Sequence, residues 1–318
     1  MPTLMSDLDL LLRRSEARML SATSDLHPTV AAPIRDLVRN RGKSLRTRML
    51  AAASGWRTNP ETVIASSVVE LIHIGTLLHD DIIDKATKRR GQPAATEAHG
   101  SDFAGVAGVC CMTIAAEMFS LMPGVQPDEL DGTLNDLVDG ERRDVERAFD
   151  VNASPADLIE IGRLKTGSLF ALACALALRG SGSSRHRAAF RDFGSAFGAA
   201  YQVVDDCLAY ASGTANKSVE VDAMNGIFGI PLVIAASSSG TIGRQVRDIA
   251  LAESWTGSRH QTLVALVRES GSIEVALDYA DRSIESAQES LLGCDLMEAR
   301  TLAAFGADVY ARARDEVV

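Results

Sequence analysis

The sequence has few cysteines and no excess of basic residues, and each shortage excludes a class of protein. Only five of the 318 residues are cysteines, and none of them forms a C-x-x-C pair. Neither a disulfide framework nor a zinc site is therefore expected, and a reducing cytoplasm fits this cysteine usage best. Acidic residues outnumber basic ones by 42 to 32, which gives a formal net charge of -10. Because nucleic-acid binding requires a positive surface, a nucleic-acid partner is excluded.

Long apolar runs are also absent. The longest, from Leu169 to Leu178, is too short to cross a bilayer as a helix, and the first charged residues are acidic rather than basic. Neither a signal peptide nor a transmembrane segment is therefore expected. The composition, 46% apolar and 23% charged, is typical of a globular protein that buries a sizeable core.

Apolar residues recur at helical spacing in segment after segment, without the alternation that marks strands. From Ile273 to Leu291, for example, one face stays apolar, and Gly293 then provides a stop. Loop-forming residues gather at 123–128, 179–187 and 237–243, in stretches too short to link two domains. The sequence thus predicts an all-α protein with one domain over residues 1–318 and roughly ten or more helices.

An acidic cluster with the pattern D-D-x-x-D lies inside an apolar helical stretch. Asp80 and Asp84 are four positions apart, so their carboxylates lie on one helix face and can bridge hard divalent cations. A solvated acidic face is the usual explanation of such a run. Here the apolar neighbours predict a largely buried helix, where three carboxylates without cations would be costly. Metal binding by Asp80, Asp81 and Asp84 is the hypothesis that follows.

A second acidic pair, Asp205 and Asp206, follows Gln202 in another apolar helical stretch. Two such clusters on separate helices can face each other across a bundle and hold metal ions between them. All candidate ligands are carboxylate oxygens, which favours Mg²⁺. Since the net charge is acidic, an anionic ligand would need local cations, and the sequence provides Lys43, Arg46, Arg89, Arg90, Lys165 and Lys217.

These motifs follow one another in the order typical of the trans-isoprenyl diphosphate synthases, the polyprenyl synthetase family, which the chain resembles over nearly its whole length. The resemblance runs through Gly42-Lys43, Glu70 to His73, the D-D-x-x-D cluster, Arg89 to Pro93, Gly140-Glu141, Lys165 to Gly167, Gln202 with Asp205-Asp206, Lys217, Asp222, Asn225 to Ile227 and Pro231-Leu232. It implies antiparallel helices around a deep central cavity, usually in a homodimer. The implied activity is an Mg²⁺-dependent prenyltransferase that condenses an allylic prenyl diphosphate with isopentenyl diphosphate.

The resemblance also implies residue roles. The Mg²⁺ ions that bridge the allylic diphosphate would be bound by Asp80, Asp84 and Asp205, with Asp81 and Asp206 in support. That diphosphate would be held by Arg89, Lys165 and Lys217. Isopentenyl diphosphate would be held by Lys43, Arg46, His73 and Arg90, although His73 could equally be a core histidine. Oxygen dipoles would be presented to the allylic cation by Thr166 and Gln202.

Several positions depart from the family pattern: Ala209 replaces an aspartate, Asp144 a glutamine or glutamate, Cys110-Cys111 a Gly-Asp pair and Gly229 a threonine. These departures leave two alternatives open, a terpene synthase that cyclises its substrate without isopentenyl diphosphate and a non-catalytic partner subunit. Retention of the cations of the isopentenyl site favours elongation over cyclisation. The intact first acidic cluster argues against a non-catalytic subunit.

Product length is implied by the residues just before the first acidic cluster. In the family, bulky residues there plug the tunnel for the growing tail, whereas Gly75 and Thr76 are small. The resemblance therefore implies a product of geranylgeranyl length or longer. Met112, Met118 or Phe119 on facing helices would close the tunnel further down, although they could equally be ordinary core residues.

Overall fold

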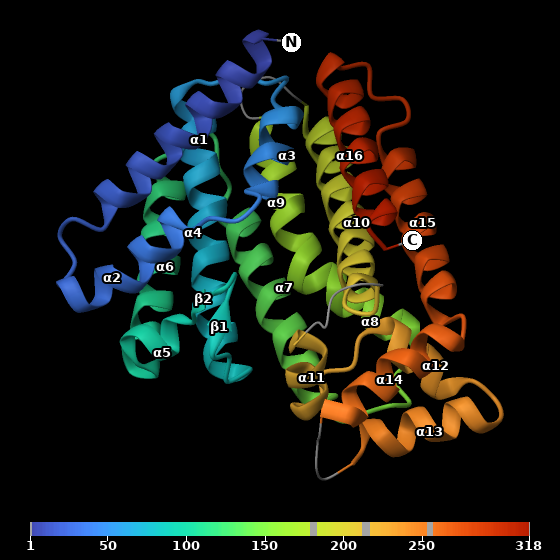
Figure 1. The fold of residues 1–318 in the computed structure, drawn as a ribbon. Helices are drawn as coiled ribbons and strands as arrows, with labels where there is room; N and C mark the ends of the chain where they lie inside the picture. The colour runs from blue at the N-terminus through green and yellow to red at the C-terminus, as the bar shows by residue number, and fades with distance from the viewer. Residues whose placement is uncertain (1, 179–182, 212–216, 253–256, 318) are drawn as a thin grey trace. The chain divides into compact units, whose positions relative to one another are not determined.

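The computed structural model describes residues 2–178, 183–211, 217–252 and 257–317, and its regular structure is almost entirely helical (Figure 1). The first part of the chain forms α1 (Pro2–Ala22), α2 (Pro28–Arg39), α3 (Leu45–Ala53), α4 (Pro60–Ile83), α5 (Ala95–His99) and α6 (Ser101–Ser120). The middle forms α7 (Pro127–Glu146), α8 (Pro155–Gly162), the π-helical turn η1 (Arg163–Gly167), α9 (Ser168–Ala177) and α10 (Ser184–Leu208). The last part forms α11 (Lys217–Met224), α12 (Ile230–Ser237), α13 (Thr241–Ala250), α14 (Gly257–Glu269), α15 (Ser272–Ser290) and α16 (Met297–Asp315). The predicted all-α fold class is confirmed.

Contacts divide the chain into two compact units, each assembled from separate stretches of sequence. The first unit consists of Met1–Gly132, Leu172–Arg191 and Cys294–Leu302, and the second of Thr133–Ala171, Asp192–Gly293 and Ala303–Val318. Four helices, α7, α9, α10 and α16, contribute residues to both units. A single domain over residues 1–318 stays a prediction.

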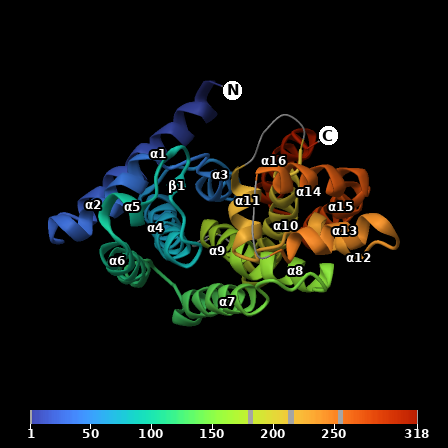
Figure 2. The same cartoon turned by 60° about the horizontal axis from the view of Figure 1, so that its bottom comes forward.

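In the first unit, α4 and α6 lie side by side and form the central pair (Figures 1 and 2). Pro60 begins α4, and Asn59 caps it: Asn59 Oδ1 accepts from the Thr62 N–H at 2.8 Å while Thr62 Oγ1 accepts from the Asn59 N–H at 2.9 Å. A Cβ on Gly75 of α4 would lie 3.1 Å from the Gly108 carbonyl oxygen of α6. The small residues thus let the two helices approach closely, and the larger apolar side chains of α4 are buried around them.

A short β-hairpin follows α4 and departs from the prediction of a strand-free chain. Its strands, β1 (Lys88–Arg89) and β2 (Gln92–Pro93), pair antiparallel. The connecting residues Arg90 and Gly91 both have positive φ, 51° and 76°, as in a type I′ two-residue turn. Strands of two residues carry no alternating pattern, which is why the sequence did not reveal them.

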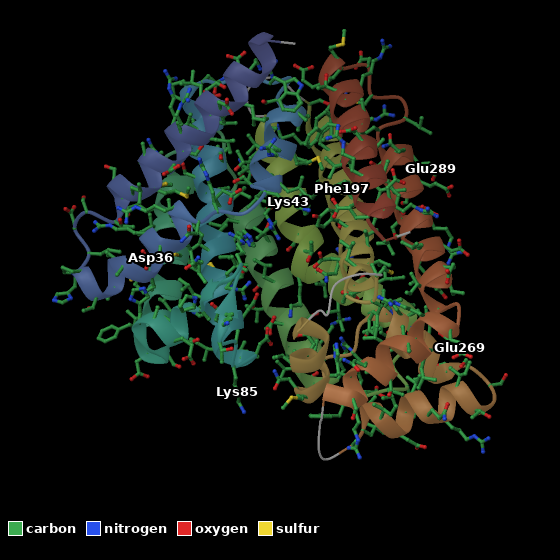
Figure 3. All side chains as sticks on the ribbon, in the orientation of Figure 1. Asp36, Lys43, Lys85, Phe197, Glu269 and Glu289 are labelled. Atoms are coloured by element: carbon green, nitrogen blue, oxygen red, sulfur yellow. The ribbon has the colours of Figure 1, made fainter. Side chains whose placement is uncertain are left out.

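In the second unit, an aromatic cluster joins α9 and α10. The rings of Phe170 and Phe197 meet edge to face with centroids 5.2 Å apart, and Phe197 also stacks on Phe193 and Tyr201. Figure 3 marks Phe197 on α10. Nearby, a Cβ on Gly198 would lie 2.5 Å from the Gly167 Cα, so only glycine allows α10 to come this close to η1. This approach places the following turn of α10 beside η1. In the same unit α12, α13 and α14 lie next to one another (Figure 2).

The π-helical turn η1 separates α8 from α9 without ending the helical run. A π-turn widens the helix by one residue, and such turns occur frequently at functional sites. The hydroxyl of Ser168 donates to the Leu164 carbonyl at 2.6 Å. This bond satisfies a carbonyl group within the widened turn.

The predicted C-terminal helix is confirmed as α15, and Gly293 follows it with φ of 78°. The predicted loops are shorter in the structure, because α7 begins at Pro127, and α12 extends to Ser237 while α13 starts at Thr241. Of the predicted loop at 179–187, residues 179–182 lie outside the described part of the chain, and α10 begins at Ser184.

Among the described residues, two helices, α4 and α6, have the length and apolar composition of a membrane span, although neither is an uninterrupted apolar run. Within the apolar window, 78% of α4 and 39% of α6 is buried. Burial of this extent in α4 is typical of a core helix. Length and composition alone are weak evidence for a membrane span, and the absence of a transmembrane segment stays a prediction.

Candidate active site

The first acidic cluster occupies the C-terminal end of α4. Asp80 is half-buried in the last turn, and Asp84 caps the helix, its backbone N–H donating to the Asp80 carbonyl at 2.8 Å. Carboxylates at this end face the negative pole of the helix dipole, at a cost of about 0.3–1 kcal/mol each. The last turn of α4 itself contains no basic residue. A cation bound at this helix end would remove the penalty.

Asp81 differs from its neighbours because its side chain is fully buried. Arg89 of β1 forms an ion pair with it, with Nη2 2.6 Å and Nε 2.7 Å from Asp81 Oδ1. The backbone N–H of Ala95 donates to the other oxygen at 3.4 Å. Asp81 was predicted to bind metal and Arg89 to hold the diphosphate. In the structure they bind each other, and their ion pair holds the hairpin on α4.

His73 of α4 meets Arg46 of α3, whose Nη1 lies 3.2 Å from His73 Nε2. Burial, followed by the charges of Arg46, Arg90 and Arg89, lowers the pKa of His73 well below its ordinary value. The imidazole is therefore neutral at pH 7, and its Nε2 accepts the hydrogen bond because a guanidinium can only donate. Three arginines thus gather around one uncharged histidine, which is the electrostatic environment of an anion site.

Arg90 reaches from the hairpin turn to the connection between α2 and α3. Its Nη1 donates to the Asn40 carbonyl at 2.7 Å, and a Cβ on Gly42 would lie 3.0 Å from its Cζ. Glycine at position 42 therefore leaves room for the guanidinium. Loss of contact with water, and then the charge of Arg89, lowers the pKa of Arg90. Lys43 is exposed on the same connection (Figure 3).

A pocket of about 390 Å³ opens beside these cations. It is lined by the end of α2, the connection that contains Gly42, the hairpin and α5, and its walls include Arg39, Arg89 and Arg90. Arginine presents its donors in a fork that matches the oxygens of a phosphate. The structure therefore brings together Arg46, His73, Arg89 and Arg90 in one unit, and Lys43 follows Gly42 at the edge of the group.

In the second unit, Thr166, Gln202 and Asp206 form a chain of hydrogen bonds. The Thr166 hydroxyl donates to Gln202 Oε1 at 2.8 Å, and Gln202 Nε2 donates to Asp206 Oδ1 at 2.9 Å. The backbone N–H of Ile230 donates to the other Asp206 oxygen at 3.2 Å. Burial raises the pKa of Asp206 to about 6. In this arrangement Asp206 orients the Gln202 amide, whose oxygen is bonded to Thr166.

Lys165 of η1 lies between two carboxylates of α7. Its Nζ is 2.6 Å from Glu141 and 2.7 Å from Asp144. Burial alone would lower the pKa of Lys165, but the charges of Asp144 and Glu141 outweigh it and raise the pKa above its ordinary value. A Cβ on Gly140 would lie 3.0 Å from the Lys165 backbone nitrogen, so glycine allows α7 to approach η1 here. Asp144, a departure from the family pattern, is therefore a direct partner of Lys165.

Asp205 is exposed in the last turn of α10, next to Asp206. As in α4, this last turn contains no basic residue, so the helix dipole disfavours the carboxylates there too. Asp205 and Asp80 belong to different units, and their meeting around shared metal ions stays a prediction. The side chain of Lys217, the first residue of α11, lies outside the described residues.

The acidic helix ends suit a metal ion whose coordination shell is completed by the phosphates of the substrate. Within the described ranges of the chain, no group of three or more His, Cys, Asp and Glu side chains could hold a metal ion. In phosphate-handling sites, however, Mg²⁺ is usually bound by one or two carboxylates together with substrate phosphates and water. Asp80 and Asp84 on one helix end and Asp205 on another provide hard oxygen donors of this kind.

Two polar residues near these groups, the buried Glu70 and the half-buried Arg147, were not predicted to have a role of their own. Glu70 is 5% exposed on α4 and accepts from both the backbone N–H and the hydroxyl of Thr47, so it fixes the start of α3 beside Arg46. The sequence signal that could have revealed Glu70 is an acidic residue within an apolar helical stretch. Arg147, described below, had no such signal, because its neighbours in the sequence are mostly charged.

Comparisons with known proteins agree with this geometry. The Polyprenyl synthetase family matches residues 27–266. The all-trans-nonaprenyl-diphosphate synthase (geranyl-diphosphate specific) of Rhodobacter capsulatus is 30% identical over 273 residues, which cover 82% of this chain and 81% of that protein. The octaprenyl diphosphate synthase of Escherichia coli is 28% identical over 265 residues, which cover 80% and 81%.

A solved structure extends the agreement to the whole fold. The polyprenyl synthase of Caulobacter crescentus, complexed with calcium and isoprenyl diphosphate, superimposes with a TM-score of 0.86 at 27% identity and covers 98% of this chain and 96% of that one. Fold and motifs together define an isoprenyl diphosphate synthase. The chain belongs to the polyprenyl synthetase family. The predicted chain-elongating prenyltransferase is confirmed, and the relatives give no support to the terpene synthase alternative.

Proposed function

We propose that this protein uses Mg²⁺ to condense an allylic prenyl diphosphate with isopentenyl diphosphate, giving a product of geranylgeranyl length or longer. The observation that carries the proposal is the separation of two sites within the first unit: an acidic helix end at Asp80 and Asp84, and a group of arginines around neutral His73. The first suits a metal-bound diphosphate and the second a diphosphate held by cations alone. Two diphosphate substrates are what chain elongation requires.

In the proposed reaction, the allylic C–O bond breaks and pyrophosphate leaves with the electron pair. Bound Mg²⁺ would neutralise the charge that develops on this leaving group. Lys165 would donate to the same diphosphate, and the Thr166 hydroxyl oxygen, whose proton is directed to Gln202, would turn its lone pairs toward the positive carbon. The double bond of isopentenyl diphosphate then attacks that carbon, and loss of a proton to pyrophosphate forms the new double bond.

The isopentenyl diphosphate would be held by Lys43, Arg46 and Arg90. Neutral His73 accepts from Arg46, which fixes the guanidinium without adding a competing positive charge. Arg89 would contribute to the field at the allylic side while its ion pair with Asp81 holds the hairpin in place. In this role Asp81 supports the site and leaves metal binding to Asp80 and Asp84.

One assay tests the proposed activity. Purified protein is incubated with Mg²⁺ and farnesyl or geranylgeranyl diphosphate, with and without isopentenyl diphosphate, and the products are identified by mass spectrometry. Longer diphosphates that form only with isopentenyl diphosphate are the expected result. Hydrocarbons or alcohols that form without it would overturn the proposal in favour of cyclisation.

The residues from which the resemblance implies the product length lie at the contact between α4 and α6. Gly75 is buried, and a Cβ there would lie 2.8 Å from the Met112 Cε of α6. Met118 and Phe119 are also buried, whereas Met112 is half-buried. Gly75 thus serves the close approach of α4 to α6, and the proposed length is supported by the two relatives described above, which are named as nonaprenyl and octaprenyl diphosphate synthases.

Lys43→Ala is expected to raise the KM for isopentenyl diphosphate by roughly ten- to a hundredfold, because a charge-assisted hydrogen bond contributes about 1.5–3 kcal/mol. The KM for the allylic substrate and the slow hydrolysis of the allylic diphosphate should change little. Comparing condensation with allylic hydrolysis separates the two effects. Lys88→Ala, at an exposed position of β1, is the matched control. Equal losses in both reactions would contradict the role assigned to Lys43.

We also propose a cytoplasmic homodimer, with one face of α6 at its interface. Phe103, Val106 and Val109 are spaced three residues apart on this helix and are 44%, 50% and 59% exposed. An exposed apolar row of this kind is suited to packing against a second copy of the chain. The scarcity of cysteines, none of them in a disulfide among the described residues, is consistent with a reducing compartment, and cell fractionation would test that location.

Val109→Asp is expected to convert the dimer to a monomer, because it places a charge in the apolar contact. Light scattering coupled to size-exclusion chromatography measures the change. Val275→Asp, at a 44% exposed position of α15, should leave the dimer intact. A dimer that persists in Val109→Asp, or a monomeric starting protein, would exclude this face of α6 as the interface.

A further inference from the structure

Arg147 follows the last residue of α7 and connects two segments of the second unit. Its side chain is only 13% exposed. One edge of the guanidinium faces Asp144, with both Nε and Nη2 3.0 Å from Asp144 Oδ1. The other nitrogen, Nη1, donates to the carbonyl of Phe228 at 3.0 Å, 81 residues further along the chain. A single side chain therefore joins the end of α7 to the segment between α11 and α12.

Through Asp144, Arg147 is also linked to Lys165. Oδ2 of Asp144 accepts from Lys165 Nζ, while Oδ1 faces Arg147, so the carboxylate is shared between the two cations. Glu141 is the second carboxylate on Lys165. Two negative and two positive groups thus form a neutral cluster. Its side chains are between 13% and 28% exposed, so water screens their charges incompletely and the balance between them matters.

Removal of the positive charge of Arg147 would change this balance. Glu141 and Asp144 together would then exceed Lys165 by one negative charge. An anion that approaches Lys165 would meet a repulsive group, and Lys165 would be held more firmly by Asp144. The cluster can therefore release Lys165 to an external oxyanion only while Arg147 compensates Asp144.

The segment held by Arg147 is anchored at two further points. The Phe149 N–H donates to the Gly226 carbonyl at 2.9 Å, and the Ile230 N–H donates to Asp206 at 3.2 Å. Gly226 has φ of 73°, and a Cβ there would lie 2.5 Å from the Phe149 nitrogen, so only glycine fits this contact. The segment is thus tied both to the Lys165 cluster and to the hydrogen-bonded chain of Thr166, Gln202 and Asp206.

We propose that Arg147 is a positioning residue for binding of the allylic diphosphate: it balances the charge of Asp144, so that Lys165 can donate to a phosphate oxygen. This inference rests on the proposed function, in which Lys165 binds that diphosphate. Arg142 and Arg143, five and four positions earlier on α7, cannot take this role, because both are exposed and paired with Asp139.

A charge-balance series tests the inference. Arg147→Gln is expected to raise the KM for the allylic diphosphate by about tenfold, with little change in the KM for isopentenyl diphosphate. In Arg147→Gln/Asp144→Asn, the neutral cluster is restored, and this KM should return to within about threefold of the starting value. Arg147→Lys keeps the charge and should recover part of the loss. Arg142→Gln, at a 52% exposed position on α7, is the matched control.

A second readout does not depend on turnover. Calorimetric titration with inorganic pyrophosphate in the presence of Mg²⁺ should show weaker binding to Arg147→Gln and recovery in the double variant, while thermal unfolding shows that each variant is folded. Unchanged pyrophosphate binding by folded Arg147→Gln would overturn the inference. A double variant as impaired as the single one would overturn it too, because a structural tether to Phe228 would then explain the loss. Failure of the unsubstituted protein to form longer diphosphates would instead overturn the proposed function.

Discussion

Replacing Asp80 and Asp84 together with alanine is expected to lower the rate of condensation by at least about a thousandfold. Both carboxylates lie at the negative end of α4 without a basic residue in the last turn, so they are placed to bind cations. Neither side chain belongs to the fully buried core. The double variant should therefore fold normally, and its circular dichroism spectrum and unfolding midpoint should match those of the unsubstituted protein. Product formation measured with radiolabelled isopentenyl diphosphate gives the rate.

Glu61→Ala provides the matched control for this experiment. Glu61 is an exposed acidic residue in the first turn of the same helix, so its loss removes a negative charge from α4 without touching the acidic end. Its condensation rate should stay within about twofold of normal. Substantial activity in the Asp80→Ala/Asp84→Ala variant would show that the metal is held elsewhere. A general loss of folding would show instead that these carboxylates are structural.

Arg89→Ala is expected to destabilise the protein by about 3 kcal/mol, which is the largest effect on stability predicted for any site residue. The reason is the ion pair with Asp81, whose side chain is 0% exposed while Arg89 is 24% exposed. Without Arg89 the Asp81 carboxylate would stay buried, and among the described residues its remaining hydrogen-bond donor would be the Ala95 N–H at 3.4 Å. Urea unfolding followed by circular dichroism measures the change in the free energy of unfolding.

Arg90→Ala is the control, because it removes the same positive charge at the next position of the same hairpin. Arg90 lies in the same hairpin, but it donates to the backbone carbonyl of Asn40 rather than to a carboxylate, so its loss should cost less than about 1 kcal/mol. A combined Asp81→Asn/Arg89→Met variant should recover much of the lost stability, because replacing both partners of a buried pair leaves no unpaired charge. Equal stability of Arg89→Ala and Arg90→Ala would refute the proposed support role of Asp81.

Much of the fold follows from local sequence patterns. Helical periodicity correctly predicts α15 together with its stop at Gly293, and the apolar residues around the first acidic cluster correctly predict the buried helix α4. The β-hairpin escapes such a prediction, because its geometry depends on two positive φ angles at Arg90 and Gly91 rather than on any periodic pattern.

The sequence predicts which types of side chain make up the site, but it does not predict the role of each residue. Spacing alone places Asp80 and Asp84 on one helix face, whereas only the packing of the hairpin reveals that Asp81 is paired with Arg89. Asp206 is a similar case, since its partners include the Ile230 N–H, 24 residues further along the chain. Arg147 donates to a carbonyl group 81 residues away. No local pattern reports contacts over such separations.

The widened turn at η1 also determines how tolerant this part of the chain is to changes in length. Lys165 and Thr166 reach Asp144 and Gln202 only because the register of the helical run shifts between α8 and α9. Deleting one residue from Arg163–Gly167 would restore ordinary α-helical spacing and rotate one flanking helix by about 100° relative to the other. The Lys165 ammonium and the Thr166 hydroxyl would then lose their partners together, even if the deleted residue were neither of these two. Chain length between Gly162 and Ser168 is thus as strict a requirement as residue identity.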